Sequence, residues 1–127
     1  MNKSKAKPKI VAIDDTTFIC ETLKAWLSAK YDIVTFLNGK DGLDFIKENN
    51  PDLVLLDYEM PGMTGYEVLM GIRSNHSIRK SLPVLFLTAV TNERMEMEMM
   101  DRGANGYIRK PLDITVLNRE ISKHLSN

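Results

Sequence analysis

The sequence predicts an α/β fold, a doubly wound five-stranded parallel sheet with helices on both faces. Apolar runs and amphipathic segments alternate five times along the chain, and the runs are apolar throughout. Strands of that kind are buried on both faces, as parallel strands between two helix layers are. The 127 residues, 43% hydrophobic and 27% charged, suit one globular domain. We expect residues 9–127 to form this domain, after a flexible lysine-rich N-terminus over residues 1–8.

The individual elements follow from the spacing of apolar residues. Continuous apolar runs predict strands over residues 10–13, 31–36, 53–57, 83–88 and 107–109. Apolar residues three or four positions apart predict helices over residues 16–29, 41–48, 66–73, 92–102 and 114–125. Thr91 or Asn92 can cap the fourth helix, and Gly103 ends it. Each strand is thus followed by a helix, which is the connection that parallel strands need.

The third predicted strand ends in a carboxylate. Four apolar residues lead into Asp57, and Pro61, Gly62 and Gly65 then turn the chain into a loop. In an open parallel sheet, ligands bind at the carboxyl ends of the strands. Asp57 is therefore predicted to stand at the mouth of a functional crevice, although a turn aspartate after a strand would by itself explain the same pattern.

Other strands end in side chains suited to the same chemistry. The carboxyl ends of four strands carry Asp14, Asp15, Asp57, Thr88 and Lys110. Crowding like charges at one edge is unfavourable unless a cation and an anion bind there. Mg²⁺ prefers oxygen ligands and bridges to phosphate oxygens. The set predicts a carboxylate nucleophile that forms an acyl phosphate, with Mg²⁺ as cofactor and with the lysine and threonine binding phosphoryl oxygens.

The distribution of charge argues against nucleic acid as a partner. The whole chain is neutral, but its first nine residues contain four lysines and no acid, so residues 10–127 carry a net charge of −4. The N-terminus lacks the apolar segment of a signal peptide, and no apolar run reaches the roughly 18 residues of a membrane span. We therefore expect a cytoplasmic protein without a membrane partner. The single Cys20 can form no internal disulfide, and we expect it to be an ordinary helix residue.

These residues resemble the receiver domains of two-component response regulators, such as chemotaxis receivers, whose fold is flavodoxin-like. The resemblance covers residues 8–126 and rests on motifs in that family's order and spacing. They are Asp14-Asp15, the run from Asp57 to Gly65, Thr88-Ala89, and Tyr107-Ile108-Arg109-Lys110-Pro111. It implies a signalling domain that promotes its own phosphorylation and dephosphorylation, and not an enzyme in the usual sense.

The resemblance also implies how the site would work. Asp57 would accept a phosphoryl group from a histidine kinase or a histidine phosphotransfer protein, and Lys110 would pair with the phosphoryl oxygens. Asp15 and Asp57 would bind Mg²⁺ directly, Glu59 would bind it through its backbone carbonyl, and Asp14 would act through a bound water.

The same resemblance implies a conformational switch. Thr88 would move towards the phosphoryl group, and Tyr107 would turn inward to fill the space that Thr88 leaves. The bond between Lys110 and Pro111 would be cis. Phosphorylation would thereby change the surface near Tyr107, which would bind an output partner protein or an output domain.

The fourth predicted helix is rich in methionine, with Met95, Met97, Met99 and Met100. At about 100° per residue, Met97, Met100 and Ala104 share one stripe, which we expect to face the core. Met95 and Met99 would then point outward and form, with Tyr107, an adaptable apolar surface for a partner. In the alternative interpretation, methionine is filler, and one or both of the outer side chains fold back against a neighbouring element.

Three other interpretations share parts of the pattern. A flavodoxin-like cofactor protein would need a hydroxyl- or glycine-rich loop after the first strand, where Asp14-Asp15 would repel a flavin phosphate. A phosphatase with an aspartyl nucleophile has a similar set of side chains, but such enzymes, by resemblance, place the nucleophile on the first strand. The chain could also be a receiver fragment of a larger regulator or of a hybrid kinase.

Overall fold

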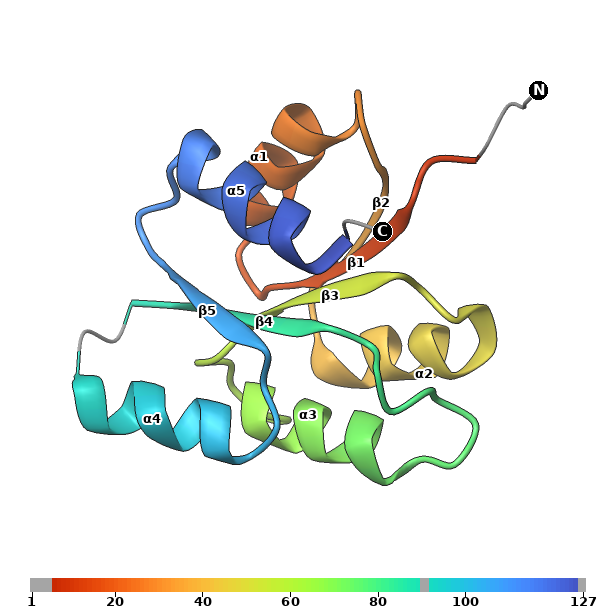
Figure 1. The fold of residues 1–127 in the computed structure, drawn as a ribbon, viewed down its shortest axis with the longest axis vertical. Coiled ribbons are helices and arrows are strands. Elements are labelled where there is room, and N and C mark those ends of the chain that lie inside the picture. Colours follow the sequence, from red (N-terminus) through yellow and green to blue (C-terminus); the bar gives the residue numbers. More distant parts are fainter. Residues whose placement is uncertain (1–5, 90–91, 126–127) are drawn as a thin grey trace.

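The computed structural model describes residues 6–89 and 92–125, which contain one parallel sheet of five strands (Figure 1). The strands are β1 (Lys9–Ile13), β2 (Asp32–Phe36), β3 (Leu53–Asp57), β4 (Val84–Thr88) and β5 (Gly106–Arg109). Their order across the sheet is β2-β1-β3-β4-β5, which puts β3 at the centre. The predicted fold class is confirmed. Residues 1–5 of the predicted flexible N-terminus lie outside the described residues.

Helices cover both faces of the sheet (Figure 1). They are α1 (Thr17–Leu27), α2 (Gly39–Asn49), α3 (Gly65–Ser74), α4 (Glu93–Asp101) and α5 (Ile114–Leu125). One core lies between the sheet and α1 with α5, and the other lies between the sheet and α2, α3 and α4. Over residues 6–89 and 92–125, no helix has the length and apolar character that crossing a membrane requires.

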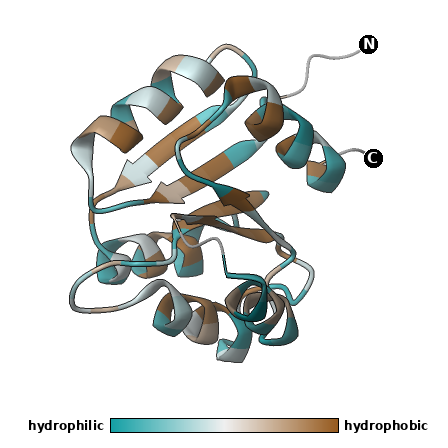
Figure 2. Cartoon of the chain, turned by 90° about the vertical axis from the view of Figure 1, so that its left-hand side faces the viewer, coloured by the Kyte–Doolittle hydropathy of each residue, from teal (hydrophilic) through white to brown (hydrophobic). Residues whose placement is uncertain are grey.

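The strands are the most apolar part of the chain and lie between the two helix layers (Figure 2). Every residue of β3 and β4 is buried, including Asp57 and Thr88 at their carboxyl ends. Burial on both faces explains why these strands show no alternation of apolar and polar residues. It also removes two polar side chains from water, which makes the carboxyl edge of the sheet chemically unusual.

The predicted boundaries agree with the structure to within two residues. The largest differences are at α1, which ends at Leu27, and at α2, which begins at Gly39 because the Asn38 side chain caps it. Asn92 caps α4 by accepting a hydrogen bond from the backbone N–H of Arg94. Thr91, the other predicted cap of that helix, lies outside the described residues.

The loop after β3 depends on a close approach that only glycine allows. A Cβ atom at Gly65 would lie 2.3 Å from the backbone carbonyl oxygen of Asp57. Thr64 and Glu67 form a capping box at the start of α3, in which each side chain accepts a hydrogen bond from the other's backbone N–H. Together these contacts place α3 directly against the end of β3 and fix the backbone that carries Asp57.

The predicted orientation of α4 is wrong. Met99 is buried, with 1% of its surface exposed, whereas Met97 and Met100 are exposed at 66% and 42%. The prediction used Ala104 to mark the core stripe, but Gly103, with a φ of 113°, turns the chain before that residue. The backbone N–H of Ala104 then bonds to the carbonyl of Met99, as in a Schellman motif. Ala104 therefore does not continue the periodicity of the helix and does not show which of its faces is buried.

A buried carboxylate accounts for the rotation of α4. Glu96 faces inward, three residues before Met99, because Arg109 on β5 binds its carboxylate. A prediction from periodicity places a glutamate on the outer face. Met95 is half-buried beside Glu96. The predicted outward pair of Met95 and Met99 therefore does not exist, and the alternative interpretation, in which these side chains pack back, is correct for Met99.

Candidate functional site

The carboxyl ends of β1 and β3 bring three predicted carboxylates together. Asp14 follows β1 and Asp57 ends β3, and these strands are neighbours in the sheet. One oxygen from each of Asp14, Asp15 and Asp57 lies within 4.8 Å of the others. Asp14 and Asp57 are buried, while Asp15 is exposed. We call these three residues the acidic cluster.

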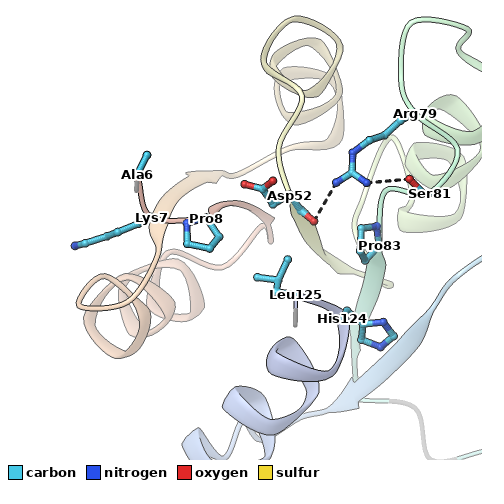
Figure 3. A pocket seen from close by; sticks show the side chains of 9 residues that line it. All are labelled: Ala6, Lys7, Pro8, Asp52, Arg79, Ser81, Pro83, His124 and Leu125. Atoms are coloured by element: carbon cyan, nitrogen blue, oxygen red, sulfur yellow. Dashed lines mark hydrogen bonds between the residues drawn. The ribbon is translucent and has the colours of Figure 1, made fainter. Parts of the chain in front are cut away.

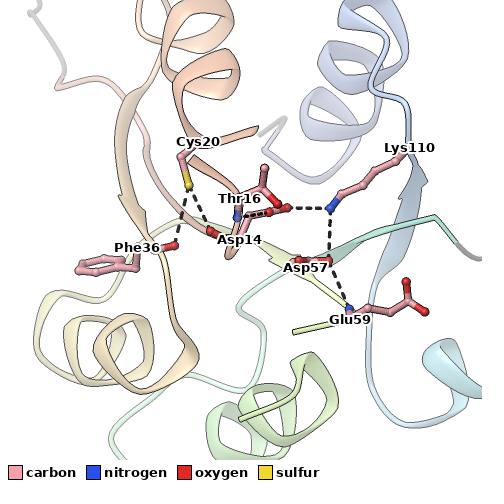
Figure 4. Close-up of polar contacts among 7 residues, drawn as sticks. All are labelled: Asp14, Thr16, Cys20, Phe36, Asp57, Glu59 and Lys110. Carbon is pink, nitrogen blue, oxygen red and sulfur yellow. Dashed lines mark hydrogen bonds and ion pairs between the residues drawn. The ribbon is translucent and has the colours of Figure 1, made fainter. Parts of the chain in front are cut away.

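Lys110 brings a positive charge to the acidic cluster (Figure 4). Its Nζ lies 2.9 Å from Asp14 Oδ2 and 3.3 Å from Asp57 Oδ1. Burial alone would lower the pKa of Lys110, but pairing with Asp14 and the charge of Asp57 outweigh burial and raise that pKa. The ammonium group therefore stays charged. One cation beside three carboxylates leaves the ionised cluster with a net negative charge.

The carboxylate of Asp57 is strongly perturbed. Burial, followed by the negative charge of Asp14, raises its pKa from 3.8 to about 6. The ammonium of Lys110 opposes this shift, as does the backbone N–H of Glu59, which donates to Asp57 Oδ1 at 3.2 Å. A perturbed carboxylate in such a cluster is typical of a functional site, because a more basic carboxylate is a better nucleophile. The Glu59 side chain itself is exposed.

Asp14 has one buried oxygen without a hydrogen bond. The backbone N–H of Thr16 donates to Oδ1 at 2.9 Å. Oδ2 forms the ion pair with Lys110 at 2.9 Å, and among the described residues it has no further hydrogen-bond donor. A cation with oxygen ligands would satisfy this atom together with the neighbouring carboxylates. The residues present therefore fit Mg²⁺.

Cys20 supports the loop that carries Asp14 (Figure 4). Its Sγ lies 3.4 Å from the backbone carbonyl oxygen of Asp14 and 3.9 Å from that of Phe36. Burial raises the pKa of the Cys20 thiol, which disfavours the thiolate. As expected from the sequence, Cys20 is a helix residue, and it lies on the buried face of α1.

The two predicted switch residues lie on β4, which is a neighbour of β3, and on β5, which is next to β4 at the edge of the sheet. Thr88 ends β4 and is buried, and its backbone carbonyl accepts a hydrogen bond of 2.8 Å from the N–H of Lys110. Tyr107 lies on β5, opposite Phe86 of β4, and is half-buried. The peptide bond between Lys110 and Pro111 is cis, as the resemblance implies.

Sequence reasoning missed one group of side chains close to this site. Glu96 on α4 accepts hydrogen bonds of 2.9 and 3.0 Å from Arg109. A hydrogen bond to Glu96 also raises the pKa of the Tyr107 hydroxyl. One feature of the sequence did indicate a shared partner: Tyr107 and Arg109 are two positions apart on a strand and therefore point to the same face of the sheet. Nothing in the local sequence indicated that their partner would be a buried glutamate.

A hollow of about 470 Å³ opens at the edge of the sheet where the strands begin, opposite the acidic cluster (Figure 3). Its lining includes Asp52, Arg79 and His124, and the Arg79 guanidinium donates to the Asp52 carbonyl and the Ser81 hydroxyl. Asp52 precedes β3, so the length of a strand, roughly 17 Å, separates this hollow from Asp57. Within the described ranges, the acidic cluster is the only group of three metal-binding side chains, so we take it as the functional site.

Comparison with protein families agrees with this geometry. Residues 10–122 match the model of the response regulator receiver domain. The chain belongs to the response regulator receiver domain family. The predicted resemblance is confirmed, and the acidic cluster with Thr88 and Lys110 lies at the edge of the sheet where the family's motifs were recognised.

Several proteins are similar in sequence or structure to almost the whole of this chain. The regulatory protein VanRB of Enterococcus faecalis is 29% identical over 114 residues, which are 89% of this chain and 50% of that protein. The chain spans half or less of the curated relatives that it matches. The structure of chemotaxis protein CheY4 of Vibrio cholerae is 29% identical, with a TM-score of 0.88, and the match covers 94% of this receiver and all of CheY4. The BeF3-activated receiver domain of DrrB from Thermotoga maritima is 26% identical, with a TM-score of 0.85 over 95% of this chain and 99% of that domain.

Proposed function

We propose that this receiver domain accepts a phosphoryl group on Asp57 from a phosphohistidine donor, with Mg²⁺ as cofactor. The observation that supports the proposal most is the position of Asp57, a buried carboxylate with a raised pKa and with Lys110 at 3.3 Å. The donor would be a histidine kinase or a histidine phosphotransfer protein. Both donors act inside the cell, so a cytoplasmic location is part of the proposal.

The transfer forms a mixed anhydride. A carboxylate oxygen of Asp57 attacks the phosphorus, the bond between phosphorus and the donor's imidazole nitrogen breaks, and its electron pair stays on that nitrogen. The donor ring leaves as neutral imidazole when its other nitrogen carries a proton. Lys110 would then bind a phosphoryl oxygen, and Thr88, at the adjacent strand end, would bind another. Hydrolysis of the same anhydride would return Asp57 to its original state.

The metal would be held by the acidic cluster. Asp15 and Asp57 would provide direct oxygen ligands, Glu59 its backbone carbonyl, and Asp14 a contact through water. Bound Mg²⁺ would neutralise the charge that develops on the phosphoryl oxygens. In this arrangement, Asp14 holds Lys110 in place, because its Oδ2 lies 2.9 Å from the ammonium group.

The α4–β5 face is the surface that we expect phosphorylation to change. It carries a hollow of about 420 Å³ lined by Glu93, Glu96, Met97, Met100, Tyr107 and Arg109. The exposed Met97 and Met100 replace the predicted Met95 and Met99 as the adaptable apolar contacts. The partner would be a separate output protein or an output domain of the same protein.

The proposal can be tested with a small phosphodonor. The protein is incubated with MgCl₂ and acetyl phosphate, and its intact mass is followed over time. A stable gain of one phosphoryl group supports a receiver that accepts phosphate. Rapid release of inorganic phosphate without a mass gain would instead indicate a phosphatase, and no reaction in either assay would contradict the proposal.

A further inference from the structure

Glu96 is a buried acid with partners on a neighbouring strand. It is 3% exposed, and Arg109 binds it through two nitrogens, Nε at 2.9 Å and an Nη at 3.0 Å. The Tyr107 hydroxyl interacts with the same carboxylate, and this interaction raises the pKa of the hydroxyl. One side chain of α4 therefore holds two side chains of β5. Removing a carboxylate from water is costly, and here the Arg109 guanidinium compensates its charge.

Few other contacts anchor α4. Along Glu93–Asp101, all of which the structure describes, Glu96 and Met99 are the buried residues. By contrast, Val68, Leu69 and Ile72 are buried on α3, against the same face of the sheet. Because a single apolar side chain of α4 is fully buried, the interaction between Glu96 and Arg109 is a large part of what fixes this helix on the sheet.

Arg109 also connects α4 to the phosphorylation site. It immediately precedes Lys110, whose ammonium contacts Asp14 and Asp57. In the parallel register, Arg109 lies opposite Thr88. Successive residues of a strand point to opposite faces, so the end of β5 directs Lys110 to the acidic cluster and Arg109 to α4. A shift of the Lys110 backbone would therefore also move Arg109 and change its contact with Glu96.

We propose that Glu96 and Arg109 form a latch that holds α4 and Tyr107 in the unphosphorylated arrangement and opposes the response to a phosphoryl group. The inference rests on the proposed function, because it assumes that a phosphoryl group binds at Asp57. Such a group draws the Lys110 ammonium away from the two carboxylates towards its own oxygens. The latch resists that shift of the strand end. Breaking it therefore makes the phosphoryl-bound state easier to reach.

Beryllofluoride serves as the phosphoryl probe, since it activated the receiver domain of DrrB. Its affinity for the full chain is measured by calorimetry in the presence of MgCl₂. We expect Glu96→Gln and Arg109→Gln each to bind it about fivefold or more tightly than the unmodified protein. Because both changes break the same contact, the double variant should gain no more than either single variant.

Glu98→Gln is the matched control, because it makes the same chemical change at an exposed position of the same helix. It should leave the affinity unchanged. The methyl resonances of Met97, Met99 and Met100 provide an independent report on α4, and in Glu96→Gln without beryllofluoride they should lie part of the way towards their bound positions. Should Glu96→Gln fail to fold, Arg109→Lys, which keeps the charge but loses the two-pronged contact, replaces it.

The outcomes separate the latch from the proposed function. Unchanged or weaker beryllofluoride affinity in the latch variants overturns the latch, provided that the unmodified protein binds the probe and Asp57→Asn does not. If the ion pair had a purely structural role, the latch variants would be less stable than the unmodified protein but would not bind beryllofluoride more tightly. If the unmodified protein takes neither beryllofluoride nor a phosphoryl group from acetyl phosphate, the proposed function is overturned, and the latch with it.

Discussion

The ammonium of Lys110 lies 3.3 Å from Asp57 Oδ1, although the two residues are 53 positions apart in the sequence. The contact joins the ends of β3 and β5, which are not neighbours in the sheet, since β4 lies between them. It lets a change of charge at Asp57 act directly on the edge strand.

Replacing Lys110 with Ala should separate phosphorylation from its effect on the α4–β5 face. Label from acetyl phosphate should still appear, although more slowly near pH 7, because loss of the cation raises the pKa of Asp57 further. The methionine methyl resonances of α4 should no longer respond to the label. Lys123→Ala, at an exposed lysine of α5, serves as the control. A full response in Lys110→Ala would contradict this role.

The raised pKa of Asp57 predicts how stability depends on pH. Between pH 3.8 and about 6, the folded protein holds a proton on Asp57 that the unfolded chain releases, so in the absence of Mg²⁺ stability falls as pH rises through this window. Each pKa unit corresponds to about 1.4 kcal/mol, which gives an upper limit of about 3 kcal/mol. Asp57→Asn should remove this loss and be the more stable protein at pH 7, with little difference near pH 3.5.

Urea titrations at several pH values measure this effect. Asp101→Asn, at an exposed position at the end of α4, provides the control, since its carboxylate is in water. Added Mg²⁺ should stabilise the unmodified protein at pH 7 more than at pH 4.5, because the cation binds the ionised cluster. An Asp57→Asn variant that is less stable than the unmodified protein at pH 7 would argue against the burial and charge repulsion described for Asp57.

The two acids after β1 should differ in their contribution to Mg²⁺ binding. Asp15 is exposed and is proposed as a direct ligand, whereas Asp14 is buried and pairs with Lys110. We expect Asp15→Asn to weaken Mg²⁺ binding more than Asp14→Asn does. A fluorescence titration that uses Trp26 or the tyrosines measures both affinities. Equal losses in the two variants would contradict the ligand assignment.

The methionines of α4 should separate into a buried residue and an exposed pair. Met99→Ala should cost about 2 to 5 kcal/mol of unfolding free energy, as for other buried methionines. Met97→Ala combined with Met100→Ala should change stability by only about 0.5 kcal/mol per residue. Denaturant titrations measure both values. A large cost for the exposed pair together with a small cost for Met99 would restore the orientation predicted from the sequence.

Much of the fold and of the site could be predicted because it depends on short-range patterns. The apolar runs identify strands buried on both faces, and polar residues at their ends meet at one edge in any parallel sheet. The proximity of Asp14, Asp57 and Lys110 could therefore be predicted without knowing the order of the strands. The structure adds that Asp14 and Asp57 are buried, which depends on how tightly the surrounding loops pack.

The orientation of α4 could not be predicted, because it depends on a contact between distant residues. Arg109 on β5 compensates the charge of Glu96, and this permits a glutamate to point towards β5 and away from water. A periodicity argument treats every glutamate as a surface residue and therefore rotates the helix the wrong way. The turn at Gly103 added to the error, since it takes Ala104 out of the helical phase. Both causes lie outside the helix itself.

Locating the phosphoryl group tests directly whether Asp57 is the residue that accepts it. The protein is labelled with acetyl phosphate and MgCl₂ and then treated with borohydride, which reduces an aspartyl phosphate to homoserine. Peptide mass spectrometry then identifies the modified residue. We expect homoserine at position 57 in the unmodified protein and no label in Asp57→Asn, which keeps its fold. Label at another residue, or undiminished label in Asp57→Asn, would contradict it.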